Sequence, residues 1–202
     1  MLFLNLIFVS CSTPPKRAEP LEKITQGQWS TTVLIRDLKK DISRNLSVDF
    51  RAERSKRLRM DITSAFGPYI GSVVLINGSF KALLAKQKAF YHGRAKAKSL
   101  KKVLNVKLDP KLLQNMIFDM PIENKMWTCE FDELKVVSQC SQNTKEIKIL
   151  WQKREGFKKT VLVTTPEFEI NMIFKEFKPD VEFSDKTFAL KPLKNFKVYK
   201  IR

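Results

Sequence analysis

Apolar and polar residues alternate with a period of two along most of this chain, and short turn sequences separate the alternating runs. Between residues 57 and 63, for example, Leu58, Met60 and Ile62 alternate with charged or polar residues. A period of two sends successive side chains to opposite faces of a β-strand, so one face of each run is apolar. Because the runs follow one another through short turns, we predict a meander of antiparallel strands.

The strands are predicted at residues 29–36, 42–52, 57–63, 70–76, 79–85, 88–92, 134–140, 146–152, 159–164, 168–174, 188–190 and 196–201. The Asn77-Gly78 pair between two of these runs is typical of a two-residue hairpin turn. The chain has 202 residues, which is enough for one domain with a sizeable core.

In the middle of the chain the period changes from two to that of a helix. Leu100, Val103, Leu104 and Val106 recur at helical spacing among lysines. A second helix is predicted after Asp109-Pro110, with an apolar stripe of Leu112, Leu113, Met116 and Ile117 that ends before Pro121. Each helix must bury its apolar face, either against an open curved sheet or, as the flanking lysines also allow, on a membrane. The fold class expected is α+β, mainly β, with an open antiparallel sheet and two or three helices over it.

The turn Ser64-Ala65-Phe66-Gly67-Pro68 places a large aromatic residue at or beside the tip of a hairpin, because Gly67 and Pro68 are turn residues. Two interpretations of Phe66 stay open. Its ring either folds back onto the sheet or projects towards lipid or an acyl chain.

The first ten residues are almost wholly apolar and end at Cys11, which Ser12-Thr13-Pro14-Pro15 follows. An apolar run of this length is too short to span a bilayer and fits a signal peptide. Phe8-Val9-Ser10-Cys11 resembles a bacterial lipobox, whose cysteine is acylated. We therefore expect a lipoprotein signal peptide at 1–10, lipidation at Cys11, a tether at 11–26 and one folded domain at 27–202. The alternative is a buried amino-terminal segment with an ordinary cysteine.

The net charge of +17 favours polyanionic partners, either nucleic acid or an anionic membrane surface, although scattered lysines also suit an ordinary solvated surface. The aromatic residues alternate along strands, which suits a core better than a platform for stacking bases. An exported lipoprotein would also be separated from DNA. We expect an anionic membrane surface as a partner and no nucleic acid.

If Cys11 is acylated, two cysteines remain, Cys129 and Cys140. They either form a disulfide with each other or are two separate buried thiols. The single histidine, His92, lies in a predicted turn, so we expect no metal site and no His-based nucleophile system. The sequence also has no glycine-rich phosphate-binding motif. A non-enzymatic protein without a cofactor is predicted.

The order of a lipidated cysteine, a tether, a meander, two helices and further strands resembles the LolA/LolB superfamily, and the likeness is closest to its LolB branch. Chains of that branch carry Asn-Pro-Leu-Gly between two strands, and Ser64-Ala65-Phe66-Gly67 stands at the matching place. Phe66 therefore takes the position of the protruding leucine, although the preceding proline is missing and Pro68 follows the glycine. Residues 106–113 and Asp119-Met120-Pro121 match the helix–proline–helix pattern in outline.

The resemblance implies a half-barrel whose helices cap an apolar cavity for lipoprotein acyl chains, with residues 66–68 as the loop that meets the membrane. The cavity residues it suggests are Leu58, Met60, Ile62, Val73, Leu75, Leu100, Leu104, Leu112 and Met116. It further implies a monomer at the periplasmic face of the outer membrane that receives acylated proteins from a LolA-like periplasmic carrier. Two other functions stay open: a carrier of free lipid or glycolipid on the same fold, and a structural envelope lipoprotein whose interior is filled.

Overall fold

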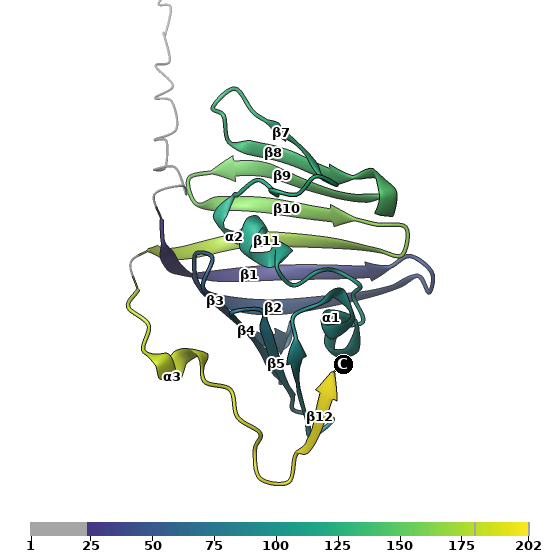
Figure 1. Cartoon of the computed structure of the whole chain (residues 1–202), viewed down its shortest axis with the longest axis vertical. Coiled ribbons are helices and arrows are strands. Elements are labelled where there is room, and N and C mark those ends of the chain that lie inside the picture. The colour runs from purple at the N-terminus through teal and green to yellow at the C-terminus, as the bar shows by residue number, and fades with distance from the viewer. Residues whose placement is uncertain (1–23, 180, 202) are drawn as a thin grey trace, which may run out of the picture.

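Twelve strands hydrogen-bond side by side in one open sheet in the computed structural model, which describes residues 24–179 and 181–201 (Figure 1). Their order in the sheet is β12-β6-β5-β4-β3-β2-β1-β11-β10-β9-β8-β7. The strands are β1 (Gln26–Asp37), β2 (Ile42–Glu53), β3 (Arg57–Ser64), β4 (Tyr69–Ile76), β5 (Ser79–Leu84), β6 (Ala89–Arg94), β7 (Thr128–Phe131), β8 (Val137–Gln142), β9 (Ile147–Glu155), β10 (Lys158–Thr164), β11 (Phe168–Pro179) and β12 (Lys197–Ile201). The predicted fold class, a mainly β protein with an open antiparallel sheet, is confirmed.

The centre of the sheet joins the two ends of the meander. β1 pairs with β2 on one side and with the distant β11 on the other, antiparallel in both cases. Along β1 the alternating residues Trp29, Val33 and Ile35 are buried on the concave face. This long-range pairing turns two separate meanders into one curved sheet with a continuous apolar face.

Two helices cover the concave face of the sheet, α1 (Ala97–Leu104) and α2 (Leu112–Phe118) (Figure 1). The Asp109 carboxylate accepts a hydrogen bond from the backbone N–H of Lys111, which helps the chain turn into α2. Asp119, with a φ of 51°, ends this helix two residues before Pro121. The apolar stripes of both helices lie against the sheet, so of the two predicted placements the structure shows packing against the sheet. No helix within the described residues has the length and apolar character needed to cross a bilayer.

The carboxy-terminal segment differs from the prediction. Phe188 ends a short helix, α3 (Asp185–Phe188), so the strand predicted at residues 188–190 is wrong. Phe188 and Leu190 are apolar because both pack on the outer face of the sheet. They form a small cluster there with Val74, Leu83 and Phe90. After it, β12 joins the edge strand β6 in parallel, whereas the predicted meander was wholly antiparallel.

Two boundaries also differ. The predicted strand at 134–140 is displaced, because Lys135 lies in a turn with a φ of 61° and β8 begins at Val137, and the edge strand β7 was not predicted. The tether predicted up to residue 26 is too long, since Ile24 is buried in the core and its carbonyl accepts a hydrogen bond from Arg54 Nε at 2.9 Å. The predicted signal peptide, Cys11 and the rest of the tether lie outside the described residues.

Candidate functional site

An apolar cavity of about 50 Å³ lies between the concave face and the two helices. Its lining side chains are all hydrocarbon or thioether groups and carry no charge. They are Val33, Ile35, Leu46, Val48, Phe50, Met60, Ile62, Leu100, Leu104, Val106, Leu108, Leu113, Met116, Ile170 and Met172. Such a surface offers contact to hydrocarbon and nothing that fixes or activates a polar substrate.

The residues suggested for the cavity divide into three groups. Met60, Ile62, Leu100, Leu104 and Met116 line it. Leu75 and Leu112 instead line an open groove on the other side of α2. Leu58 and Val73 face the same side of the sheet but are packed completely into the core, with exposures of 0% and 1%.

Several cavity residues were not suggested by the sequence, above all Val33 and Ile35 of β1 and Ile170 and Met172 of β11. Their alternation was visible as strand pattern. Alternation alone does not indicate which strands pair. In the structure β1 pairs with β11, so that Val33 is opposite Met172 and Ile35 is opposite Ile170. That pairing places four apolar side chains under α1 and α2.

The helices fill most of the hollow in this conformation. Water takes up roughly 30 Å³ per molecule in the liquid, so a cavity of about 50 Å³ has no room for an acyl chain. An acyl chain could enter the cavity only if one of the covering helices moved. The two helices differ in the number of polar contacts that hold them to the sheet.

Helix α1 is held by few polar contacts. Arg44 Nη2 on β2 donates a hydrogen bond of 3.1 Å to the Leu104 carbonyl at the end of the helix. At its start, Ser99 Oγ donates to the Arg94 carbonyl at 2.7 Å. Only Ser99 and Leu100 of its eight residues are buried, and its lysines face solvent.

Helix α2 is anchored at both ends. Gln114 Nε2 donates to the carbonyls of Glu53 and Arg57, which flank the β2–β3 turn, at 3.3 and 3.2 Å. At the other end the buried Lys159 ammonium donates to the Ile117 carbonyl at 2.6 Å and to the Asp119 carboxylate. Polar contacts with the sheet are therefore more numerous for α2 than for α1.

The Lys159 ammonium is 2% exposed and lies over the Phe174 ring, 4.9 Å from its centroid. Burial lowers its pKa below the ordinary value of 10.5, and the charge of Asp119 opposes that shift. Arg154 also reaches Asp119, with 3.6 Å between Nε and the carboxylate. This buried ion cluster closes one end of the concave face.

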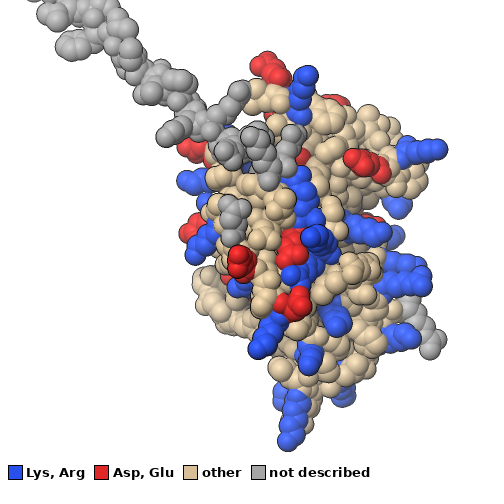
Figure 2. All heavy atoms as spheres, turned by 60° about the vertical axis from the view of Figure 1, so that its left-hand side comes forward, with Lys and Arg blue, Asp and Glu red and all other residues tan. Residues whose placement is uncertain are grey.

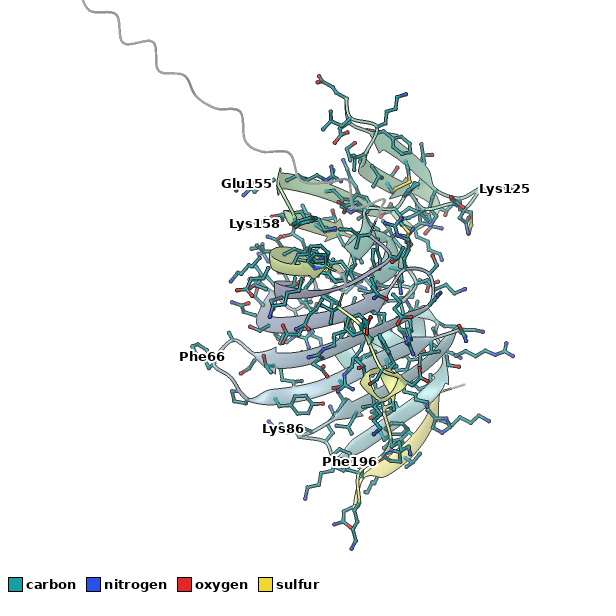
Figure 3. All side chains as sticks on the ribbon, turned by 90° about the vertical axis from the view of Figure 1, so that its left-hand side faces the viewer. Phe66, Lys86, Lys125, Glu155, Lys158 and Phe196 are labelled. Carbon is teal, nitrogen blue, oxygen red and sulfur yellow. A yellow bond between two sulfur atoms is a disulfide. The ribbon has the colours of Figure 1, made fainter. Side chains whose placement is uncertain are left out.

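The β3–β4 turn projects from the sheet, and Phe66 at its tip is 96% exposed (Figure 3). Gly67 has a φ of 102°, which few other residues adopt, and its N–H donates to the Ser64 carbonyl at 3.0 Å. The Phe66 ring therefore projects and does not fold back onto the sheet, and its contact with lipid stays a prediction.

Cationic and apolar side chains also lie in the other turns at this end of the sheet. Lys39 and Lys40 lie in the β1–β2 turn and Lys86 in the β5–β6 turn, all at the end of the sheet where Phe66 projects. Leu38 and Ile42 there are 43% and 52% exposed. Lysines and arginines also outnumber acidic residues over the face shown in Figure 2. Exposed apolar side chains among cations are the composition of a surface that meets anionic lipid.

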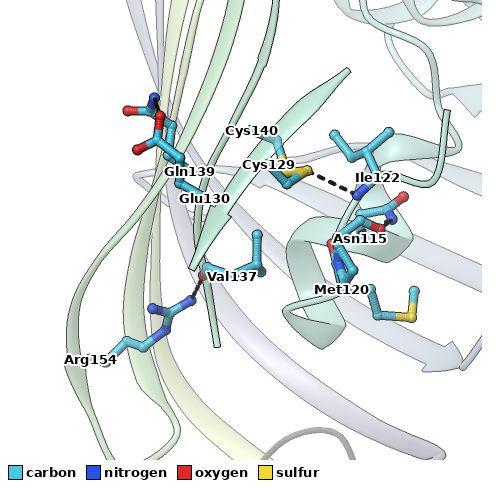
Figure 4. Close-up of a disulfide and its surroundings, with 10 residues drawn as sticks. Asn115, Met120, Ile122, Cys129, Glu130, Val137, Gln139, Cys140 and Arg154 are labelled. Carbon is cyan, nitrogen blue, oxygen red and sulfur yellow. Dashed lines mark hydrogen bonds between the residues drawn. A yellow bond between two sulfur atoms is a disulfide. The ribbon is translucent and has the colours of Figure 1, made fainter. Parts of the chain in front are cut away.

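At the β7 edge of the sheet, Cys129 and Cys140 form a disulfide between directly opposed positions of β7 and β8 (Figure 4). The backbone N–H of Ile122 donates to Cys129 Sγ at 3.3 Å. The disulfide thus links the neighbouring strands β7 and β8, and the Ile122 hydrogen bond connects the segment after α2 to it. The described residues contain no group of three or more His, Cys, Asp and Glu placed to hold a metal ion.

An open curved sheet with helices on its concave face is also found in a solved protein of the LolA superfamily. A LolA superfamily protein from Nitrosomonas europaea superposes with a TM-score of 0.52 at 3% sequence identity, over 83% of this chain and 91% of that one. A DUF1329 family protein from Desulfovibrio piger gives 0.46 at 11% identity, over 84% and 91% of the two chains. An uncharacterized conserved protein from Thermus thermophilus gives 0.43 at 12%, over 91% and 96%. No protein-family model and no curated protein matches the sequence.

Proposed function

We propose that this chain is a non-enzymatic lipoprotein of the cell envelope that binds acyl chains. The observation that carries the proposal is the cavity under α1 and α2, whose fifteen lining residues are all apolar. Hydrocarbon is the ligand that such a lining favours, at about 0.8 kcal/mol for each methylene group moved out of water.

Binding requires α1 to move away from the sheet while α2 stays in place. The Arg44 hydrogen bond to the end of α1 is the contact that breaks, and the cavity opens towards the side that α1 covers. Displaced Leu100 and Leu104 then exchange contacts with the sheet for contacts with the acyl chain. The free energy of entry is therefore a difference between two sets of apolar contacts.

Delivery needs a destination that binds the acyl chain better than the cavity does. Phe66 inserts into the bilayer and the lysines of the neighbouring turns bind anionic headgroups, at about 1 kcal/mol for each well-placed cation. In this proposal Gly67 and Pro68 shape the turn that holds Phe66 at the membrane.

We further propose the LolB-type role for the chain. It is anchored through acylated Cys11 at the periplasmic face of the outer membrane and acts as a monomer. There it receives acylated proteins from a LolA-like carrier and releases them into the bilayer. The superfamily fold, the lipobox-like Phe8-Val9-Ser10-Cys11 and the exposed Phe66 support this role.

A carrier of free lipid is the second candidate, and the open groove beside the cavity favours it. The groove is lined by cationic side chains that would suit the headgroup of a lipid.

The test uses the full-length chain with Cys11→Ser, which cannot be acylated at that position, and native mass spectrometry after incubation with palmitate. Leu104→Asn changes the cavity lining, whereas Val103→Asn changes a half-buried neighbour on α1 that does not line it. We expect palmitate bound to the parent protein and to Val103→Asn, and weaker binding to Leu104→Asn. Absence of bound palmitate from the parent protein would refute the proposed function.

A further inference from the structure

A groove of about 1120 Å³ lies on the far side of the segment that covers the cavity. The wall between groove and cavity is one chain thick. In the irregular stretch before α2, Val106 and Leu108 line the cavity, while the alternate residues Lys107 and Asp109 line the groove. The two spaces therefore lie on opposite sides of one segment, with an apolar lining on one side and a partly charged lining on the other.

The same division continues along α2. Leu113 and Met116 face the cavity, whereas Leu112, Gln114 and Asn115 face the groove. The α1–α2 connection and the first turn of α2 thus separate hydrocarbon on one side from hydrogen-bonding groups on the other.

The groove carries an excess of positive charge. Its cationic side chains are Arg54, Lys56, Lys107, Lys111 and Lys145, and its acidic ones are Asp109, Asp119 and Glu123. The Asp119 charge is already compensated by Lys159 on the other side of α2. The positive charge that remains in the groove favours an anionic ligand.

Two of the lysines lie at the same part of the groove. Gln114 holds the first turn of α2 against the β2–β3 turn through its hydrogen bonds to the Glu53 and Arg57 carbonyls. Lys56 lies in that β2–β3 turn, and Lys111 lies three residues before Gln114, on the same side of α2. Neither lysine forms a salt bridge within the described part of the chain.

A groove residue also carries a hydrogen-bond acceptor without a partner. Gln114 Oε1 is buried, lines the groove and finds no donor among the described residues. Its Nε2 already donates to two carbonyls, so the amide orientation is set and the oxygen faces away from them. A buried acceptor without a protein partner can accept a hydrogen bond from water or from a hydroxyl group of a ligand.

We propose that the groove binds the headgroup of a phosphate-bearing acyl lipid, with the phosphate between Lys56 and Lys111 and a headgroup hydroxyl donating to Gln114 Oε1. α1 contributes Ala97 to the groove and Leu100 and Leu104 to the cavity, so its displacement joins the two spaces and the lipid's acyl chain enters the cavity there. This inference rests on the proposed function in its second form, a carrier of free lipid.

The test compares lysophosphatidylglycerol with monoacylglycerol of the same acyl chain, each titrated as monomers into the full-length Cys11→Ser chain and measured by calorimetry. The test variant is Lys56→Gln/Lys111→Gln. The control, Lys98→Gln/Lys102→Gln, removes the same charge from exposed residues of α1 that do not line the groove.

We expect the parent protein and the control to bind lysophosphatidylglycerol more tightly than monoacylglycerol, and the test variant to lose about thirtyfold in affinity for the phospholipid only. Lysophosphatidic acid, which has the phosphate without the glycerol headgroup, should bind more weakly than lysophosphatidylglycerol if Gln114 accepts a headgroup hydroxyl.

Equal affinity for the two lipids, or an equal loss in both double variants, would overturn the headgroup site and leave acyl-chain binding intact. Failure of both lipids to bind would instead overturn the proposed function itself.

Discussion

Replacement of Phe66 by glutamate tests whether the β3–β4 turn meets a membrane. The side chain is 96% exposed and contributes nothing to the core, so the free energy of unfolding should change by less than about 0.5 kcal/mol. Transfer of a phenylalanine side chain out of water is worth about 1.5–3 kcal/mol. Phe66→Glu should therefore weaken binding to anionic vesicles by about tenfold to a hundredfold.

The assay is flotation of the full-length Cys11→Ser chain with vesicles that contain phosphatidylglycerol, and thermal unfolding reports on the fold. Phe131→Glu is the matched control, since Phe131 is a half-exposed phenylalanine on the distant edge strand β7. We expect the control to float like the parent protein. If Phe66→Glu binds vesicles as well as the parent protein does, the turn is not a membrane contact and this part of the mechanism is wrong.

Three further predictions follow from the contacts of the helices and the outer face. Arg44→Ala removes the hydrogen bond to the end of α1, so amide exchange in α1 should accelerate about fivefold, whereas Arg36→Ala, whose ion pair lies in the β1–β2 turn, should leave it unchanged. Lys159→Met should lower the free energy of unfolding in urea by about 3 kcal/mol, with part of the loss recovered in Lys159→Met/Asp119→Asn; a fully stable Lys159→Met would contradict the anchoring of α2. Burial alone would raise the pKa of Asp61, but hydrogen bonds from its arginine and serine neighbours outweigh burial and hold the pKa below its ordinary value of 3.8. The unfolded state then binds more protons, so stability should fall as the pH drops below 3.8, and Asp61→Asn should flatten that acid dependence in unfolding curves.

Local parts of the fold could be predicted because local patterns determine them. The alternation of Leu58, Met60 and Ile62 correctly indicated a strand with its apolar face inward. The Asn77-Gly78 pair forms the expected hairpin turn, with φ of 48° and 74°. In both cases the residues that determine the structure are neighbours in the sequence.

Long-range pairing was not predictable in the same way. The parallel addition of β12 to β6 and the packing of Phe188 on the outer face depend on residues about a hundred positions apart. Alternation says that a residue faces inward, but not whether a helix packs onto it. The sequence therefore could not distinguish Leu58, which is completely buried in the core, from Met60, which lies two residues further along the same face and lines the cavity.

The groove was not visible in the sequence at all. Lys56 and Lys111 were two lysines among many, and only the contact between α2 and the β2–β3 turn brings them to one place. The unpartnered oxygen of Gln114 likewise depends on where its amide nitrogen is held.

Photo-crosslinking tests the central claim most directly. A fatty acid with a diazirine at the end of its chain is bound to the full-length Cys11→Ser protein, activated with light and located by peptide mass spectrometry. The account predicts label on residues that line the cavity, such as Met60 and Met116, which only a chain that has displaced α1 can reach. Label confined to exposed positions such as Phe66 or Phe131 would show that the acyl chain stays outside, and would contradict the account.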